Sequence, residues 1–233
     1  MSASILRYKD TRTREKLDID RENLWLHFVV RPLSVYPTRL FLALGVSPNQ
    51  TTFIGIVISI AGCCLLAFGD YWMVLIGAII INIGFLVDVI DGNIARHKRQ
   101  ATKYGGYIDN LADRLVAGIV PIALSTGLYA TLGNALYLVL GMGWAFFITF
   151  KCLITESYRV SFGEKARRFY KAETKSLIYR AGIAIETSMI PLLLISAIVD
   201  IAWLFMIIWT AITGFEMIFV GILTLIKTPR NNI

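Results

Sequence analysis

The chain has 233 residues, of which 56% are hydrophobic and 17% are charged, whereas soluble domains are about 45–50% apolar and about 25% charged. This composition excludes an ordinary soluble domain and favours an integral membrane protein. The net charge of +7 comes mainly from basic residues between the predicted membrane spans, which topology explains. We therefore expect no nucleic-acid partner.

The first two segments of the chain precede any predicted span. Residues 1–22 are rich in charges and lack the apolar core of a signal peptide, so we expect a cytosolic N-terminal arm. Residues 23–46 mix aromatic and aliphatic residues with Arg31 and Arg39. This mixture predicts an amphipathic helix that lies in the membrane interface.

The rest of the chain contains six apolar segments, each close to the roughly 20 residues that a helix needs to cross about 30 Å of hydrocarbon. They cover residues 51–68, 71–90, 107–131, 135–155, 181–199 and 201–226. The predicted fold class is thus an all-α integral membrane protein with six transmembrane helices preceded by an interfacial amphipathic helix. We expect one membrane domain over 47–228 and a cytosolic tail over 229–233.

Basic residues predict the orientation of these spans, because cytoplasmic loops carry the excess of Lys and Arg. They cluster in the N-terminal arm, at 96–103, at 159–175 and near the C-terminus, and the turns at the opposite ends contain none. Six helices with both termini in the cytosol satisfy this pattern. We expect a multi-pass protein of the cell membrane, with some attraction to anionic lipid.

Two pairs of aspartates lie at the ends of neighbouring predicted spans. Asp88 and Asp91 are three residues apart and Asp109 and Asp113 are four apart, so each pair shares one face of its helix. The two spans run in opposite directions, which puts both pairs about 5–15 Å from the loop at 97–104. We expect all four carboxylates to meet at one depth, near the cytosolic face.

Four carboxylates in a membrane repel one another unless a cation lies between them. Arg96 and Arg114 can offset only part of this charge. Hard oxygen ligands favour Mg²⁺ or Mn²⁺ over zinc, and four carboxylates can hold two such ions, as in phosphoryl transfer. Gly92 and Gly105 leave room for a ligand's phosphates or base, and Arg96 lies within reach of a phosphate held there.

A divalent metal-ion transporter or channel would also place acids in the membrane. It would need them nearer the midplane, and Arg96 opposes the passage of a cation. A purely structural scaffold would leave the acids unexplained. We interpret His97 as an interfacial residue, and Gly77 and Gly84 as positions that let helices pack closely. Helix packing or a dimer contact is at least as good an interpretation of Glu216 as a functional role.

The spacing of these residues resembles the signature of the CDP-alcohol phosphotransferase (CDP-alcohol phosphatidyltransferase) family. All eight fixed positions are filled, in the order Asp88-x2-Asp91-Gly92-x2-Ala95-Arg96-x8-Gly105-x3-Asp109-x3-Asp113. The sequence SPNQTT at 47–52 is similar to the Pro-Asn-x-x-Thr that opens the family's first span. The stretch leading into it, RPLSVYPTRLFLALGVSPNQTT, resembles members that make inositol phosphate phospholipids.

The resemblance implies an enzyme of phospholipid biosynthesis that acts as a homodimer. An acceptor alcohol would attack the phosphorus of a CDP-activated lipid or alcohol and release CMP, and 47–228 would be the catalytic domain. Asp88, Asp91 and Asp109 would bind the metal ions with Asp113 beside them, and Asp113 would also be the general base. The CDP pocket would be lined by Gly92, Ala95, Arg96 and Gly105, with contributions from Asn49 and Thr52.

Two basic residues lie deeper than a loop would place them. Lys151 is near the cytoplasmic end of the fourth predicted span and Arg180 near the start of the fifth, each about 10 Å inside. Snorkelling of long side chains toward lipid headgroups is one interpretation. The other is that Lys151, Arg159 and Arg180 bind an anionic group of the acceptor. That hypothesis favours inositol phosphate or glycerol phosphate as the small polar acceptor over serine, choline or ethanolamine.

Overall fold

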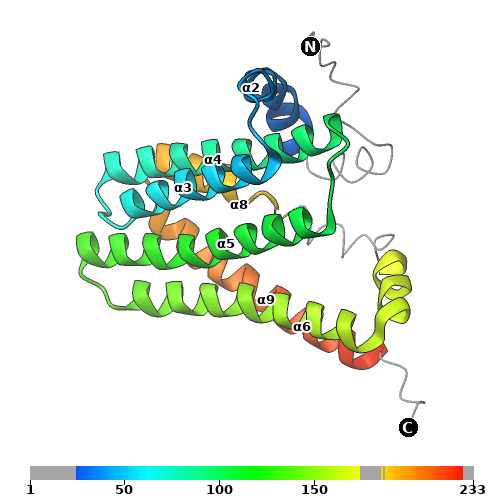
Figure 1. Cartoon of the computed structure of the whole chain (residues 1–233). Coiled ribbons are helices and arrows are strands. Elements are labelled where there is room, and N and C mark those ends of the chain that lie inside the picture. The colour runs from blue at the N-terminus through cyan, green and yellow to red at the C-terminus, as the bar shows by residue number, and fades with distance from the viewer. Residues whose placement is uncertain (1–24, 174–184, 186, 228–233) are drawn as a thin grey trace.

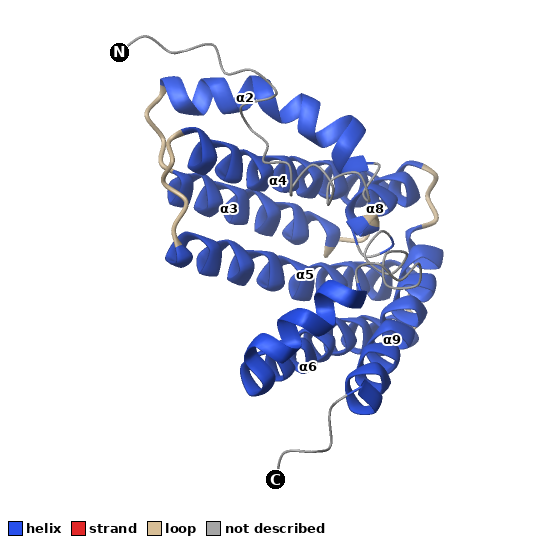
Figure 2. Cartoon of the chain, turned by 90° about the vertical axis from the view of Figure 1, so that its right-hand side faces the viewer, coloured by secondary structure: helices blue, strands red, loops and turns tan. Residues whose placement is uncertain are grey.

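The protein is described by a computed structural model that covers residues 25–173, 185 and 187–227. Regular secondary structure within these residues is entirely helical (Figures 1 and 2). In chain order the elements are a π-helical turn η2 (Leu26–Val30), α2 (Arg31–Ala43), α3 (Pro48–Leu66), α4 (Tyr71–His97), α5 (Lys103–Leu132), α6 (Leu136–Glu173), α8 (Met189–Ile198) and α9 (Ala202–Lys227).

Five of the described helices are long and apolar enough to cross a membrane, namely α3, α4, α5, α6 up to residue 164, and α9. This confirms the prediction of an all-helical, multi-pass membrane protein. α8 has ten residues, too few to span by itself. The predicted span over 181–199 begins outside the described residues, so the count of six spans stays a prediction.

The long helices lie side by side, and α3 packs against both α4 and α5 (Figure 1). α5 then packs against α6 and α6 against α9, while α8 lies against α4 and α9. The short loop 98–102 joins the end of α4 to the beginning of α5. The last turns of α4 and the first turns of α5, which carry the motif, therefore lie at the same end of the bundle.

Side-chain caps fix where the helices begin. α3 starts with a capping box, in which the Gln50 N–H donates to Ser47 Oγ at 3.3 Å and the Ser47 N–H donates to Gln50 Oε1 at 2.9 Å. Asp70 accepts from the Met73 N–H at the start of α4, and Thr102 Oγ1 accepts from the Gly105 N–H at 2.9 Å at the start of α5.

α3 and α4 approach each other closely along small residues. A Cβ added to Gly62 would lie 2.8 Å from the Gly77 carbonyl oxygen, and one added to Gly77 would lie 2.7 Å from the Gly62 carbonyl oxygen. Nearer the motif, a Cβ on Gly84 would lie 3.2 Å from the Gly55 carbonyl oxygen. These contacts confirm that Gly77 and Gly84 serve helix packing, and they bring the start of α3 against the end of α4.

α2 crosses the long helices instead of running along them, as Figures 1 and 2 show from two sides. Its polar residues Arg31, Ser34 and Thr38 are buried and pack toward α4, whereas Leu33 and Tyr36 are 53% and 71% exposed. An outward apolar face is the reverse of what a helix on a soluble protein presents. It is what a helix at a membrane interface would turn toward lipid, which supports the predicted interfacial position.

Candidate active site

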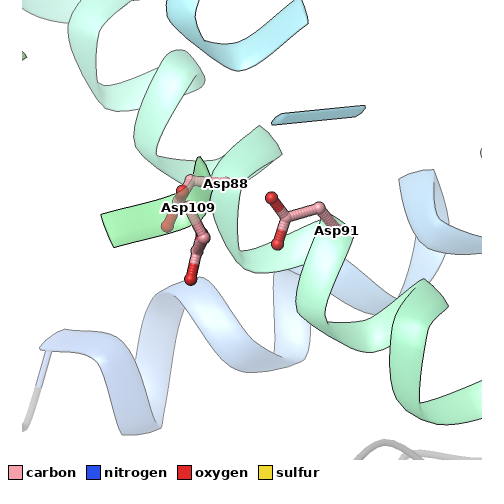
Figure 3. Close-up of side chains that lie close together, drawn as sticks. All are labelled: Asp88, Asp91 and Asp109. Atoms are coloured by element: carbon pink, nitrogen blue, oxygen red, sulfur yellow. The ribbon is translucent and has the colours of Figure 1, made fainter. Parts of the chain in front are cut away.

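Three carboxylates of the motif come together between α4 and α5. Asp88 and Asp91 lie in the second half of α4 and Asp109 in the second turn of α5. One oxygen from each lies within 4.8 Å of the other two, and in Figure 3 the Asp91 carboxylate points toward the side chains of Asp88 and Asp109. Asp91 is buried, while Asp88 and Asp109 are half-buried.

The start of α3 holds this cluster from the other side. Thr52 Oγ1 donates a hydrogen bond to Asp91 Oδ2, and both side chains are buried. The close contact of Gly55 with Gly84 makes this possible, because a Cβ on Gly55 would lie only 3.4 Å from the Gly84 carbonyl oxygen. The structure thus places Thr52 against a carboxylate of the cluster.

The donor set fits a hard divalent cation. Among the described residues, no lysine, arginine or histidine forms an ion pair with Asp88, Asp91 or Asp109. Three carboxylates that share a small space without a basic partner repel one another. Oxygen donors without Cys or His are the set that Mg²⁺ and Mn²⁺ prefer, so these three residues are suited to bind such an ion.

Asp113 lies one helical turn beyond Asp109 and faces two cavities. The first, of about 70 Å³, lies between α3, α4, α5 and α8, and Asp88 and Thr52 line it too. The second, of about 270 Å³, lies between α5 and α6 and is lined also by Arg114 and Thr149. Asp113 is therefore the carboxylate that joins the cluster of Asp88, Asp91 and Asp109 to the space beside α6.

The residues predicted to line the CDP pocket occupy the same end of α3, α4 and α5. A Cβ on Gly92 would lie 3.1 Å from Arg96 Nη1, so Arg96 folds back over the turn that follows Asp91. A Cβ on Gly105 would lie 3.5 Å from Asn49 Oδ1, which places the first turns of α3 and α5 side by side. Ala95 is half-buried on the same stretch of α4.

The structure describes two of the three predicted acceptor-binding residues, Lys151 and Arg159, and both form ion pairs. The ammonium of Lys151, on α6, is buried and pairs with Glu216 Oε2 on α9 at 2.8 Å. Arg159, further along α6, pairs with Glu156 at 3.0 Å. Arg180 lies outside the described residues.

A buried polar cluster that was not predicted from the sequence lies between α2 and α4. Its members are Arg31, Ser34 and Thr38 on α2 and Asn93 on α4. The signal was present, because residues 31, 34 and 38 recur at helical spacing on one face. The burial of this face was not predicted, because an amphipathic helix at a membrane interface is expected to turn its polar face toward water.

Comparison with known proteins identifies the family. Residues 45–220 match the family model described as CDP-alcohol phosphatidyltransferase. The chain therefore belongs to this family, which confirms the resemblance seen in the spacing of the aspartates.

Individual relatives agree with this assignment. Over 87 residues, 36% of this chain and 44% of the relative, the protein is 32% identical to the archaetidylinositol phosphate synthase of Pyrococcus horikoshii. It thus spans less than half of the length of that curated relative.

Two solved structures share the fold. The phosphatidylinositol phosphate synthase of Mycobacterium tuberculosis with CDP-DAG bound superposes with a TM-score of 0.60 and 18% identity, covering 87% of this chain and 96% of that one. The same synthase in complex with manganese and citrate gives a TM-score of 0.50 and 20% identity, covering 84% and 90%.

Proposed function

We propose that this protein transfers the phosphatidyl group of a CDP-activated lipid such as CDP-DAG to the hydroxyl of a small polar alcohol, and releases CMP. The observation that carries the proposal is the cluster of Asp88, Asp91 and Asp109 inside the matched family region, with Asp113 beside it. Solved relatives of the same fold are described with CDP-DAG and with manganese, which supports this donor and a metal requirement.

Each residue has a defined task in this reaction. The acceptor oxygen forms a bond to the phosphorus of the phosphatidyl group, the bond from that phosphorus to the CMP oxygen breaks, and Asp113 takes the hydroxyl proton. A divalent ion on Asp88, Asp91 and Asp109 would neutralise charge on the pyrophosphate and on the leaving CMP. Arg96 would contact a donor phosphate, and a second ion would require Asp113 in the ligand set.

The position of Asp113 suggests where the two substrates meet. The donor would lie on the α3–α4 side, where Thr52 and Gly92 flank the carboxylates, and the acceptor would enter the larger cavity between α5 and α6. The base would then lie beside the acceptor hydroxyl where the two cavities meet, so that the hydroxyl oxygen can face the donor phosphorus. This arrangement is what a direct displacement requires, because the reacting atoms must be aligned before the proton leaves.

We propose a phosphorylated acceptor, inositol phosphate or glycerol phosphate, bound through Lys151, Arg159 and Arg180. The relatives named above are inositol phosphate phospholipid synthases, and Arg114 and Arg159 both contact Glu156 near the larger cavity. Lys151 already pairs with Glu216, and this ion pair competes with binding of the acceptor phosphate by Lys151. Variants that remove the ion pair test this role directly.

We also propose six spans with both termini and the active site in the cytosol, in a homodimer surrounded by membrane lipid. The basic residues at 96–103 lie at the end of the bundle where α4 meets α5, which supports this orientation. A Gln100→Cys variant should resist a membrane-impermeant thiol reagent added outside intact cells. Ready labelling of the variant, compared with the chain that lacks this substitution, would show that the loop faces the outside and would contradict the proposed orientation.

The proposed activity is tested by supplying purified protein with CDP-DAG, Mg²⁺ or Mn²⁺ and a panel of alcohols, and measuring CMP release. Inositol phosphate or glycerol phosphate should support turnover far above that with inositol, serine or no acceptor. Chelation of the divalent ion should abolish it. Turnover that requires no divalent ion would contradict the metal assignment, and a preference for an uncharged or zwitterionic acceptor would contradict the acceptor assignment.

A further inference from the structure

Asn93 stands inside the family motif, between Gly92 and Ala95, yet its side chain faces α2. It is fully buried, with 0% of its surface exposed. Its Nδ2 donates to Ser34 Oγ at 3.0 Å and to Thr38 Oγ1 at 3.2 Å. Its Oδ1 accepts from Arg96 Nη2 at 2.9 Å and from Arg31 Nη1 at 3.3 Å. An amide has two donors and two acceptor positions, so Asn93 uses all four.

The neighbouring hydroxyls fix which way the amide points. Ser34 Oγ donates its proton to the Arg31 carbonyl at 2.8 Å, and Thr38 Oγ1 donates to the Ser34 carbonyl at 2.6 Å. Both hydroxyl oxygens therefore present lone pairs to Asn93, which suits the NH₂ group and not the carbonyl oxygen. The oxygen is thereby directed at the two guanidinium groups.

Arg96 is the member of this network that reaches the candidate site. Its guanidinium lies above Gly92, since a Cβ there would be 3.1 Å from Nη1 and 3.2 Å from Nη2. Gly92 directly follows Asp91, the buried carboxylate of the metal-binding cluster. The hydrogen bond to Asn93 therefore holds the Arg96 side chain along α4, over the turn that follows Asp91.

We propose that Asn93 is a positioning residue for the donor nucleotide: it fixes the Arg96 guanidinium for the phosphates of the CDP group, and the polar face of α2 fixes Asn93 in turn. This inference rests on the proposed function and extends it to α2, which contributes nothing to the carboxylate cluster itself. Because α2 crosses the bundle at the membrane interface, its packing on α4 would then affect the affinity for the donor.

The first test compares two asparagines of the same helix. Asn93→Leu, which keeps the number of side-chain heavy atoms and removes the amide, should raise the donor KM about tenfold, because a hydrogen bond to a charged group is lost. The acceptor KM should stay within about twofold. Asn82 is the matched control: its Nδ2 donates to the Ala78 and Ile190 carbonyls at 2.9 and 3.2 Å, far from Arg96, and Asn82→Leu should leave the donor KM unchanged.

A double-mutant cycle separates positioning from general damage to the fold. In the Arg96→Ala background, Asn93→Leu should change the donor KM less than about twofold, because the group that Asn93 positions is already gone. A merely structural role would give the full effect again in that background. The same cycle can be measured with the affinity for CDP in Mg²⁺ in place of the donor KM, which requires no turnover.

The α2 side of the network provides a variant that leaves the motif intact. Ser34→Ala with Thr38→Ala removes both acceptors of the Asn93 amide and should raise the donor KM several-fold, so it keeps the inference testable even if Asn93→Leu does not fold. An unchanged donor KM in Asn93→Leu, or independent effects in the cycle, would overturn the inference. If the wild-type protein were inactive but the variants still weakened CDP binding as predicted, the proposed function would be wrong and this inference would stand.

Discussion

The two sides of Asp113 are built differently. Toward α3 and α4 the helices touch backbone to backbone, Thr52 bonds to Asp91, and the cavity is about 70 Å³. Toward α6 the cavity is about 270 Å³, and the charged groups nearby are partly exposed. The difference suggests that the donor side is fixed in advance by packing and buried hydrogen bonds, whereas the acceptor side keeps room for a substrate to enter.

The largest effect is expected at the residue that joins the two sides. Asp113→Asn keeps the shape of the side chain but cannot accept the hydroxyl proton, so turnover should fall by about 10²–10⁴-fold. The affinity for CDP in Mg²⁺ should be largely retained. Steady-state CMP release and CDP titration measure the two quantities, and near wild-type turnover would remove Asp113 as the base.

The second prediction concerns the ion pair of Lys151 and Glu216 between α6 and α9. Its removal tests whether this contact stabilises the acceptor side. Lys151→Met leaves the largely buried Glu216 carboxylate, whose side chain is 13% exposed, without this partner, and should reduce stability by about 3 kcal/mol. Lys151→Met combined with Glu216→Gln should recover part of that loss in thermal unfolding.

The acceptor KM then decides the role of Lys151. If Lys151 also binds the acceptor, this KM stays raised in the double variant. If the ion pair is only structural, the KM returns to the value of Glu216→Gln alone.

Close packing on the donor side can be broken without touching the site. Gly77→Ala places a methyl group 2.7 Å from the Gly62 carbonyl oxygen and 3.0 Å from the Leu66 nitrogen, both backbone atoms that cannot yield easily. We expect a loss of about 1–3 kcal/mol and a lower melting temperature in detergent. Gly118→Ala on α5 is the control, because a Cβ there meets nothing within 4 Å. An equal loss in both variants would contradict the account of α3–α4 packing.

Filling the cavity between α5 and α6 with a larger side chain is expected to have a smaller effect. Cys152 lines the larger cavity, and Cys152→Phe should raise the acceptor KM about tenfold while the donor KM stays the same. Cys152→Ala enlarges the space slightly and should change neither constant appreciably. If Cys152→Phe raised the donor KM instead, the assignment of the two cavities would have to be exchanged.

The sequence predicted the parts of this site that depend on local spacing. Asp88 and Asp91 share a helix face by their three-residue separation, and the loop length between α4 and α5 brings Asp109 back to the same depth. The helix boundaries near Ser47 and Thr102 were not predicted, although the capping residues are visible in the sequence. The helix that contains the predicted apolar segment 71–90 continues through the charged residues to His97.

What the sequence did not predict depends on contacts between distant segments. The pairing of Lys151 with Glu216 joins residues 65 positions apart, and the bond from Thr52 to Asp91 joins residues 39 apart. Neither follows from periodicity. The burial of Arg31 was unexpected for a related reason: hydropathy separates the two faces of α2, but only the packing on α4 shows that the polar face is the buried one.

The central claim is that Asp88, Asp91 and Asp109 bind a divalent ion through which the CDP donor is held. The most direct measurement is the melting temperature of the purified protein with CDP, with Mg²⁺, and with both. CDP should raise the melting temperature only when Mg²⁺ is present, and Asp91→Ala should abolish that rise. Stabilisation by Mg²⁺ alone with no further effect of CDP, as expected of an ion transporter, or a CDP effect that persists in Asp91→Ala, would contradict the claim.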